Sequence, residues 1–135
     1  MKVYMKDNQI ATENLTPGMN VYGEELIQED CEYRLWNPRR SKLAAAFLNG
    51  LSTLNIEYNS KVLYLGASTG TTVSHISDII TCGRIYAVEF SPVTMKKLVR
   101  LARTRHNIAP ILADATKPKQ RNNKKLHTKN NKILH

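Results

Sequence analysis

The chain has 135 residues, of which 41% are hydrophobic and 7% aromatic, and it carries 20 Lys and Arg against 11 Asp and Glu. This length suits one ordinary domain, and the hydrophobic fraction is too high for a wholly disordered protein. No stretch reaches the roughly 20 uncharged apolar residues of a membrane span, so we expect no membrane association. Cys31 and Cys82 lie 51 positions apart with no Cys or His at metal-ligand spacing, which argues against a disulfide framework or a zinc site.

The two ends of the chain differ in charge and in what they predict. The first ten residues lack the uninterrupted apolar run of a secretory signal, so we expect the mature chain to begin near Met1, in the cytoplasm. Residues 1–116 hold 13 Lys and Arg against 11 Asp and Glu, whereas residues 117–135 hold seven basic side chains and no acidic one. Nonspecific attraction to nucleic acid is therefore expected mainly from the tail.

Three sections follow one another along the chain. Over residues 1–33, short alternating runs separated by turn residues predict an antiparallel β-layer. From 34 to 118 helical and strand patterns alternate, which is typical of parallel βαβ units and predicts a partial Rossmann-like domain of the α/β class. Residues 119–135 show no periodicity, and we expect them to be disordered.

Each element of the middle section has its own signal. Asn37-Pro38 predicts the start of a helix whose apolar stripe ends near Gly50. A second helix is expected between Gly70 and Gly83, and Ser91-Pro92 predicts the start of a third. Three short apolar runs predict the buried strands, at residues 61–65, 84–89 and 111–114.

The turn after the first of these strands is the place where chemistry is expected. In doubly wound sheets, ligands bind beyond the carboxyl ends of the strands, where glycine lets them approach the backbone. Gly66 and Gly70 lie in this turn, and Glu89 follows Gly66 by 23 positions, close to the ~20 typical of an acid that binds ribose hydroxyls. Asp114 ends the next strand and could meet an adenine amino group. On spacing alone, a tight turn with a solvated strand end explains these residues equally well.

A basic cluster surrounds the expected start of the first helix. Arg39, Arg40 and Lys42 would lie in its first turns, where the helix dipole makes cations unfavourable by a few tenths of a kcal/mol each. Screening by solvent is one explanation. The other is that these residues, with Arg34, meet an anion such as RNA phosphate. Trp36 is expected to pack between the β-layer and this helix.

Several segments of the chain resemble archaeal fibrillarin over about residues 9–118. The most specific segments are Tyr33-Arg-Leu-Trp-Asn-Pro-Arg-Arg-Ser-Lys-Leu43 and Glu89-Phe-Ser-Pro92. The others are residues 11–18, 21–24, 63–72, 74–78 and 110–118. The resemblance implies a ribose 2′-O-methyltransferase that uses S-adenosylmethionine and acts on rRNA or tRNA. It also implies a particle containing guide RNA, a Nop-family scaffold protein and a kink-turn-binding ribosomal protein.

The resemblance assigns roles to individual residues. It implies that Lys42 is catalytic and that cofactor contacts come from Gly66, Thr71, Thr72, Glu89, Phe90, Asp114 and Ala115. Fibrillarins continue past the segment matching residues 110–118 for about as long again, through a further strand, an aspartate and a second catalytic lysine. The Lys- and Asn-rich sequence here is typical of an out-of-frame reading of an A/T-rich gene, and we expect a truncation or a frameshift. The alternative is a natural basic arm that binds RNA.

A half-sheet would leave one side of the strand at residues 61–65 without a neighbour, which favours aggregation or pairing with a partner.

Two functions stay open. The chain is either a methyltransferase by descent that is inactive alone, or a noncatalytic module that binds RNA or the scaffold protein.

Overall fold

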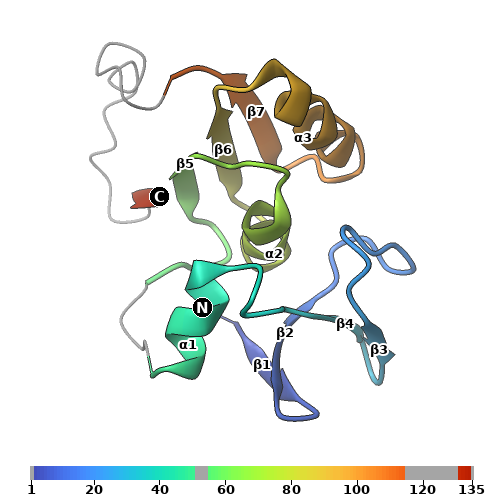
Figure 1. Ribbon diagram of the computed structural model, residues 1–135. Helices are drawn as coiled ribbons and strands as arrows, with labels where there is room; N and C mark the ends of the chain where they lie inside the picture. Colours follow the sequence, from blue (N-terminus) through green and yellow to red (C-terminus); the bar gives the residue numbers. More distant parts are fainter. Residues whose placement is uncertain (1, 51–54, 115–130, 135) are drawn as a thin grey trace.

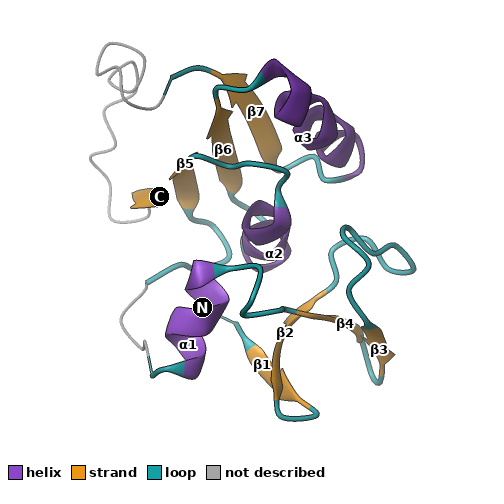
Figure 2. Ribbon diagram, viewed as in Figure 1, coloured by secondary structure: helices purple, strands orange, loops and turns teal. Residues whose placement is uncertain are grey.

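The computed structural model of the chain describes residues 2–50, 55–114 and 131–134. These residues form two four-stranded sheets (Figure 1). Helix α2, purple in Figure 2, lies between the two sheets. None of the described helices is long and apolar enough to cross a bilayer.

The N-terminal sheet is antiparallel, as predicted. Its strands are β1 (Tyr4–Lys6), β2 (Gln9–Glu13), β3 (Leu26–Gln28) and β4 (Glu32–Leu35), in the order β1-β2-β4-β3. Asp7 and Asn8 join β1 to β2 with φ angles of 50° and 60°. The type I′ turn of a two-residue hairpin requires a positive φ angle at both turn residues, and Asp and Asn tolerate this conformation better than most residues.

The second sheet is parallel and confirms the α/β class. Its strands are β5 (Lys61–Leu65), β6 (Arg84–Glu89), β7 (Ile108–Leu112) and β8 (Asn131–Leu134), in the order β7-β6-β5-β8. The predicted strand at 111–114 is wrong by three residues at its start. β7 includes Pro110, which has no backbone N–H to donate to a neighbouring strand. The proline is tolerated because β7 is an edge strand of this sheet.

The far side of β5 is occupied, which corrects the expectation that it has no neighbour. β8 pairs with β5 in parallel from Lys61 opposite Asn131 to Tyr64 opposite Leu134. Strand β8 lies within the segment 119–135 that the sequence analysis expects to be disordered, while residues 119–130 and 135 lie outside the described residues. The side chain of Leu134 packs against the core, so two apolar residues in a polar segment suffice for a short strand once a sheet edge is present.

Within the described ranges, three helices accompany the sheets: α1 (Lys42–Leu48), α2 (Thr71–Ile79) and α3 (Pro92–Thr104). The N-cap of α3 is Ser91, as expected, but α1 begins four residues later than Pro38. Its N-cap is Ser41, whose Oγ accepts a hydrogen bond from the Ala44 N–H at 3.3 Å. The Asn37 side chain accepts instead from the Arg39 N–H at 2.9 Å and forms a turn. Arg39 and Arg40 therefore precede the helix, and only Lys42 lies in its first turn.

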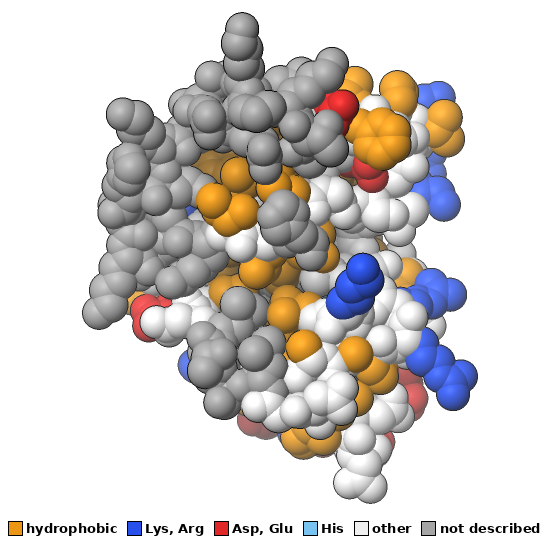
Figure 3. Space-filling model, turned by 60° about the vertical axis from the view of Figure 1, so that its left-hand side comes forward, with side chains coloured by type: hydrophobic (Ala, Val, Ile, Leu, Met, Phe, Trp, Pro, Cys, Tyr) orange, Lys and Arg blue, Asp and Glu red, His pale blue; other side chains and the backbone are white. Residues whose placement is uncertain are grey.

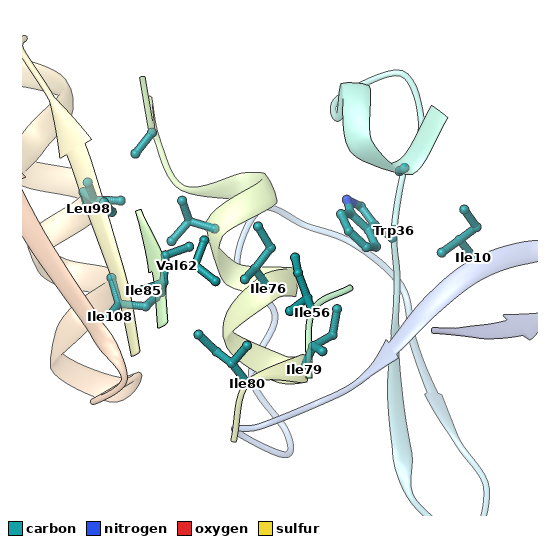
Figure 4. Close-up of a cluster of buried hydrophobic side chains, with 14 of the residues drawn as sticks. Ile10, Trp36, Ile56, Val62, Ile76, Ile79, Ile80, Ile85, Leu98 and Ile108 are labelled. Carbon is teal, nitrogen blue, oxygen red and sulfur yellow. The ribbon is translucent and has the colours of Figure 1, made fainter. Parts of the chain in front are cut away.

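One hydrophobic core joins the two sheets through α2. Figure 4 shows Val62, Ile85 and Ile108 of the parallel sheet on one side of α2, and Trp36 and Ile10 of the N-terminal segments on the other. Trp36 is fully buried and lies 5.9 Å from the ring of Phe47 in α1. The prediction that Trp36 packs between the β-layer and this helix is confirmed.

Candidate functional site

The turn after β5 is held against the end of β6. The N–H groups of Gly66 and Ala67 both donate to the Val88 carbonyl, at 3.0 and 2.8 Å. Gly66 has a φ of 79° and Gly70 a φ of 95°, both in the left-handed region that favours glycine. A Cβ at Gly70 would lie 2.7 Å from Leu101 Cδ2, whereas a Cβ at Gly66 would meet nothing within 4 Å. Gly70 is therefore needed for packing, while Gly66 leaves open space beside the backbone.

A cavity of about 480 Å³ opens beside this turn, and Lys42 is one of the residues that line it. Its lining residues come from the start of α1, the end of β5, the turn and the start of α2: Arg40, Ser41, Lys42, Tyr64, Gly66, Ala67, Ser68, Thr69, Thr71 and Thr72. The structure thus brings together five of the residues singled out in the sequence, which are Arg40, Lys42, Gly66, Thr71 and Thr72. None of the lining residues in the described part of the chain is acidic.

A hydrogen bond between two helices explains why Lys42 reaches the cavity. Thr72 Oγ1 in the first turn of α2 donates to Ser41 Oγ at 2.9 Å. Because Ser41 is also the N-cap of α1, this contact ties the start of one helix to the start of the other, and Lys42 is the next residue. Sequence reasoning missed Ser41. The available signal was the preference of N-caps for serine directly before a helical apolar run.

Glu89, Phe90 and Asp114 lie at the same edge of the sheet but do not line this cavity. Glu89 ends β6 and is nearly buried, and its Oε1 accepts from the Phe90 N–H at 2.9 Å. Phe90 is 73% exposed. The Ala113 N–H donates to the Glu89 carbonyl at 3.1 Å, which brings the chain before Asp114 next to Glu89. Ala115 lies outside the described residues.

Arg34 does not belong to the basic surface that the sequence suggested. Its side chain is fully buried and donates to Glu24 Oε2 at 2.6 Å, Asp78 Oδ2 at 2.8 Å and Ser74 Oγ at 2.8 Å. Arg105, at the end of α3, donates to Asp78 Oδ1 at 2.6 Å. The two arginines and two carboxylates form a neutral buried cluster that joins the N-terminal sheet to α2 and α3. Arg34 is thus structural, and RNA phosphate cannot reach it in this fold.

His75 extends this cluster and is held at both ring nitrogens. Its Nδ1 lies 2.8 Å from Thr12 Oγ1, and its Nε2 lies 2.6 Å from the Tyr22 hydroxyl. The Trp36 ring stacks on it with centroids 4.7 Å apart. Burial, together with the charges of Arg34 and Arg105, holds the pKa of His75 well below its usual range. Burial also raises the pKa of Tyr22 to about 12, so its hydroxyl stays protonated.

Arg39 and Arg40 remain on the surface. The Arg40 guanidinium lies over the Tyr22 ring at 5.7 Å from its centroid, a distance typical of a cation–π contact. Within the described part of the chain, no group of three His, Cys, Asp or Glu side chains could hold a metal ion.

Comparison with known proteins identifies the family. The sequence profile of fibrillarin matches residues 1–127. The chain belongs to the fibrillarin family. Over 117 residues it is 54% identical to the fibrillarin-like rRNA/tRNA 2′-O-methyltransferase of Methanothermobacter thermautotrophicus. This match covers 86% of this chain and 52% of that protein. The corresponding enzyme of Thermococcus onnurineus is 58% identical over 112 residues, covering 82% of this chain and 50% of its relative.

Solved fibrillarin structures have the same fold over the matched region. Aeropyrum pernix fibrillarin, crystallised with natively bound S-adenosyl-L-methionine, is 50% identical with a TM-score of 0.81, covering 87% of this chain and 54% of that one. A fibrillarin in complex with Nop5p is 46% identical with a TM-score of 0.77, at the same coverage of 87% and 54%. The chain therefore spans about half the length of the fibrillarins it matches.

Proposed function

We propose that the chain contributes to S-adenosylmethionine-dependent 2′-O-methylation of ribose in rRNA or tRNA, directed by a guide RNA. The observation that carries this proposal is the cavity in which Lys42 faces the turn from Gly66 to Thr72. In this fold, the carboxyl ends of the strands are where ligands bind. An ammonium group at this place is suited to hold a ribose hydroxyl or a nearby phosphate oxygen.

The residues at the sheet edge fit the cofactor. Open space beside Gly66 allows a ligand to approach the backbone. Glu89 has one carboxylate oxygen bonded to the Phe90 N–H, and among the described residues its Oε2 has no hydrogen-bond partner, so it can accept from ribose hydroxyls. Gly66, Thr71, Thr72, Glu89, Phe90, Asp114 and Ala115 would hold the cofactor. When bound, it supplies a methyl group on a sulfonium, which a hydroxyl oxygen can attack.

The lining of the cavity supports a role for this chain in orienting the acceptor rather than in completing the reaction alone. Attack by a 2′-hydroxyl requires alignment, which can contribute about 7–11 kcal/mol, and it requires a group that takes the proton. Lys42 is exposed and can orient the ribose. No carboxylate lines the described cavity to accept the proton. We therefore propose that the chain is inactive alone and that the remaining groups belong to the C-terminal half of longer fibrillarins.

The proposed partners follow from the relatives. A fibrillarin has been crystallised with Nop5p, which supports a Nop-family scaffold protein as a partner. The names of the relatives, which are rRNA/tRNA 2′-O-methyltransferases, support rRNA or tRNA as the target. Guide RNA and a kink-turn-binding ribosomal protein are proposed from the family resemblance alone.

Calorimetry with S-adenosylmethionine tests the cofactor site. We expect weak binding by the full chain, lost in Glu89→Ala because the ribose hydroxyls lose their acceptor. Glu57→Ala is the matched control, since Glu57 is an exposed glutamate that precedes β5 at the opposite end of the strand. Undiminished binding heat in Glu89→Ala would rule out its proposed role.

A tritiated methyl donor tests transfer in a particle reconstituted with guide RNA and both proteins. We expect no turnover above the no-enzyme control with this chain, and restored turnover when the C-terminal half of a fibrillarin is added as a separate polypeptide. The restored activity should be lost in Lys42→Ala and kept in Lys61→Ala, an exposed lysine at the amino end of β5. Turnover without the added half, lost in Lys42→Ala, would contradict the proposed inactivity and show that the chain or a partner supplies the missing groups. Binding of RNA or scaffold protein without any rescue would favour the noncatalytic module.

A further inference from the structure

A second cavity adjoins the one that contains Lys42. It has a volume of about 620 Å³ and lies between the loop at residues 19–22, the start of α2 and the outer face of α3. Arg40, Thr69 and Thr71 line both cavities. The two cavities therefore adjoin, with Arg40, Thr69 and Thr71 at their common border.

The lining of this second cavity is basic. Arg40, Lys97 and Arg100 line it, and no Asp or Glu among the residues that the structure describes does so. Lys97, Arg100 and Thr104 recur at helical spacing, so they share one face of α3. The neighbouring cavity, which Arg39 lines, differs because the acidic residues Glu24 and Glu25 line it as well. Figure 3 shows that Lys and Arg side chains gather along one side of the molecule.

The loop at residues 19–22 forms the wall of this cavity opposite α3, and hydrogen bonds hold it in place. The Glu24 carboxylate accepts from the N–H groups of Val21 and Tyr22, both at 2.8 Å. Asn14 Nδ2 donates to the Met19 carbonyl at 3.1 Å. Tyr22, over which Arg40 lies, is itself anchored to the buried His75. A wall held in this way loses little conformational freedom on binding, which favours affinity.

We propose that this groove, lined by Arg40, Lys97 and Arg100, holds the sugar–phosphate backbone of the RNA strand that carries the methyl acceptor. The inference rests on the proposed function, since a strand with one ribose at Lys42 must extend its neighbouring nucleotides into an adjoining space. Cations supply the attraction for phosphate, and the Thr69 and Thr71 hydroxyls can donate to phosphate or ribose oxygens. Contacts to the backbone position a strand without reading its sequence. Arg40, which lines both cavities, is assigned as the positioning residue between them.

Fluorescence anisotropy with a labelled 12-nucleotide single-stranded RNA tests the groove in the full chain. The variant Lys97→Ala/Arg100→Ala removes two groove cations. Lys96→Ala/Arg103→Ala removes the same charge from the same helix, at exposed positions that do not line the groove. We expect the groove variant to lose about tenfold in affinity, and its logarithmic salt slope to fall by about 1.4, or about 0.7 for each phosphate contact. The control pair should change affinity less than about threefold.

Equal losses in the two pairs, or no loss in either, would overturn the groove and indicate attraction by net charge or by the tail. Calorimetry with S-adenosylmethionine separates this result from failure of the proposed function. The groove variant should bind the cofactor as the parent chain does, and a loss there would also overturn the proposal. If the parent chain binds no cofactor but the two pairs still differ toward RNA, the proposed function fails while the groove remains.

Arg40 needs a readout that a merely structural role would not move. In the particle rescued by the C-terminal half of a fibrillarin, Arg40→Ala should raise the KM for target RNA at least about tenfold, and Arg40→Lys should restore part of it. Arg39→Ala should leave this KM within about twofold. A fall in kcat alone, with KM unchanged, would contradict positioning of the strand by Arg40.

Discussion

Replacing Asp78 with asparagine removes the charge that the buried cluster depends on. The carboxylate is fully buried and accepts four hydrogen bonds, from Arg34, Arg105, Thr12 and the Leu15 N–H. In Asp78→Asn, two buried guanidinium groups lose their shared counter-ion and face an amide that can itself donate. Breaking a buried ion pair by removing one partner costs about 3–5 kcal/mol, a large part of the roughly 5–15 kcal/mol that stabilises a typical domain.

Urea unfolding followed by tryptophan fluorescence measures this loss. Trp36 is the only tryptophan of the chain, and it lies in the core against His75, so it reports on the junction that Asp78 holds. The matched control is Glu29→Gln, which removes the acid of the surface pair with Lys6, where the atoms are also 2.6 Å apart. We expect this control to change the free energy of unfolding little, because exposed pairs contribute little. Equal effects in Asp78→Asn and Glu29→Gln would refute the reasoning.

Two further predictions concern His75 and β8. His75 is neutral in the fold, whereas in the unfolded chain it binds a proton as the pH falls through about 6.5, so the unfolded state gains protons and stability falls. The free energy of unfolding should fall by about 1.4 kcal/mol for each pH unit below about pH 6; urea titrations at pH 7.5 and 5.0 should show a smaller fall in His75→Gln, and parallel curves would contradict this. In β8, Leu134→Ala should cost about 1–2 kcal/mol because Leu134 packs against the core, whereas Ile133→Ala should cost little because Ile133 is 55% exposed. If Leu134→Ala and Ile133→Ala unfold thermally at the same midpoint temperature, β8 does not contribute to the stability of the sheet.

Local signals predicted the elements that depend on neighbouring residues. The apolar run of β5, the following turn and the run of β6 were placed correctly, because buried parallel strands need continuous apolar segments. Ser91-Pro92 likewise predicted the start of α3. Where two local signals competed, the sequence misled: Asn37-Pro38 looked like a helix start, but its side chain forms a turn and Ser41 caps α1 instead.

The surroundings of charged side chains were not predictable in the same way. Arg34 has the same basic character as Arg39 and Arg40 in the sequence, yet it is buried while they are exposed. Its position on β4 points it toward α2, where Asp78, 44 positions later, supplies a counter-ion. Nothing local in the sequence reveals such a pairing, because it depends on how the N-terminal sheet packs against the helix.

The amino-acid sequence by itself determined the fold class, the family resemblance and the turn at which ligands are expected, since these depend on periodicity and short motifs. Only the tertiary structure decided that Lys42 shares a cavity with Gly66, Thr71 and Thr72, that Arg34 is buried and that β8 lies beside β5. Each of these outcomes depends on contacts between residues far apart in the chain. The free energy of such contacts comes from burial and charge pairing, which exist only after the sheets and helices have packed together.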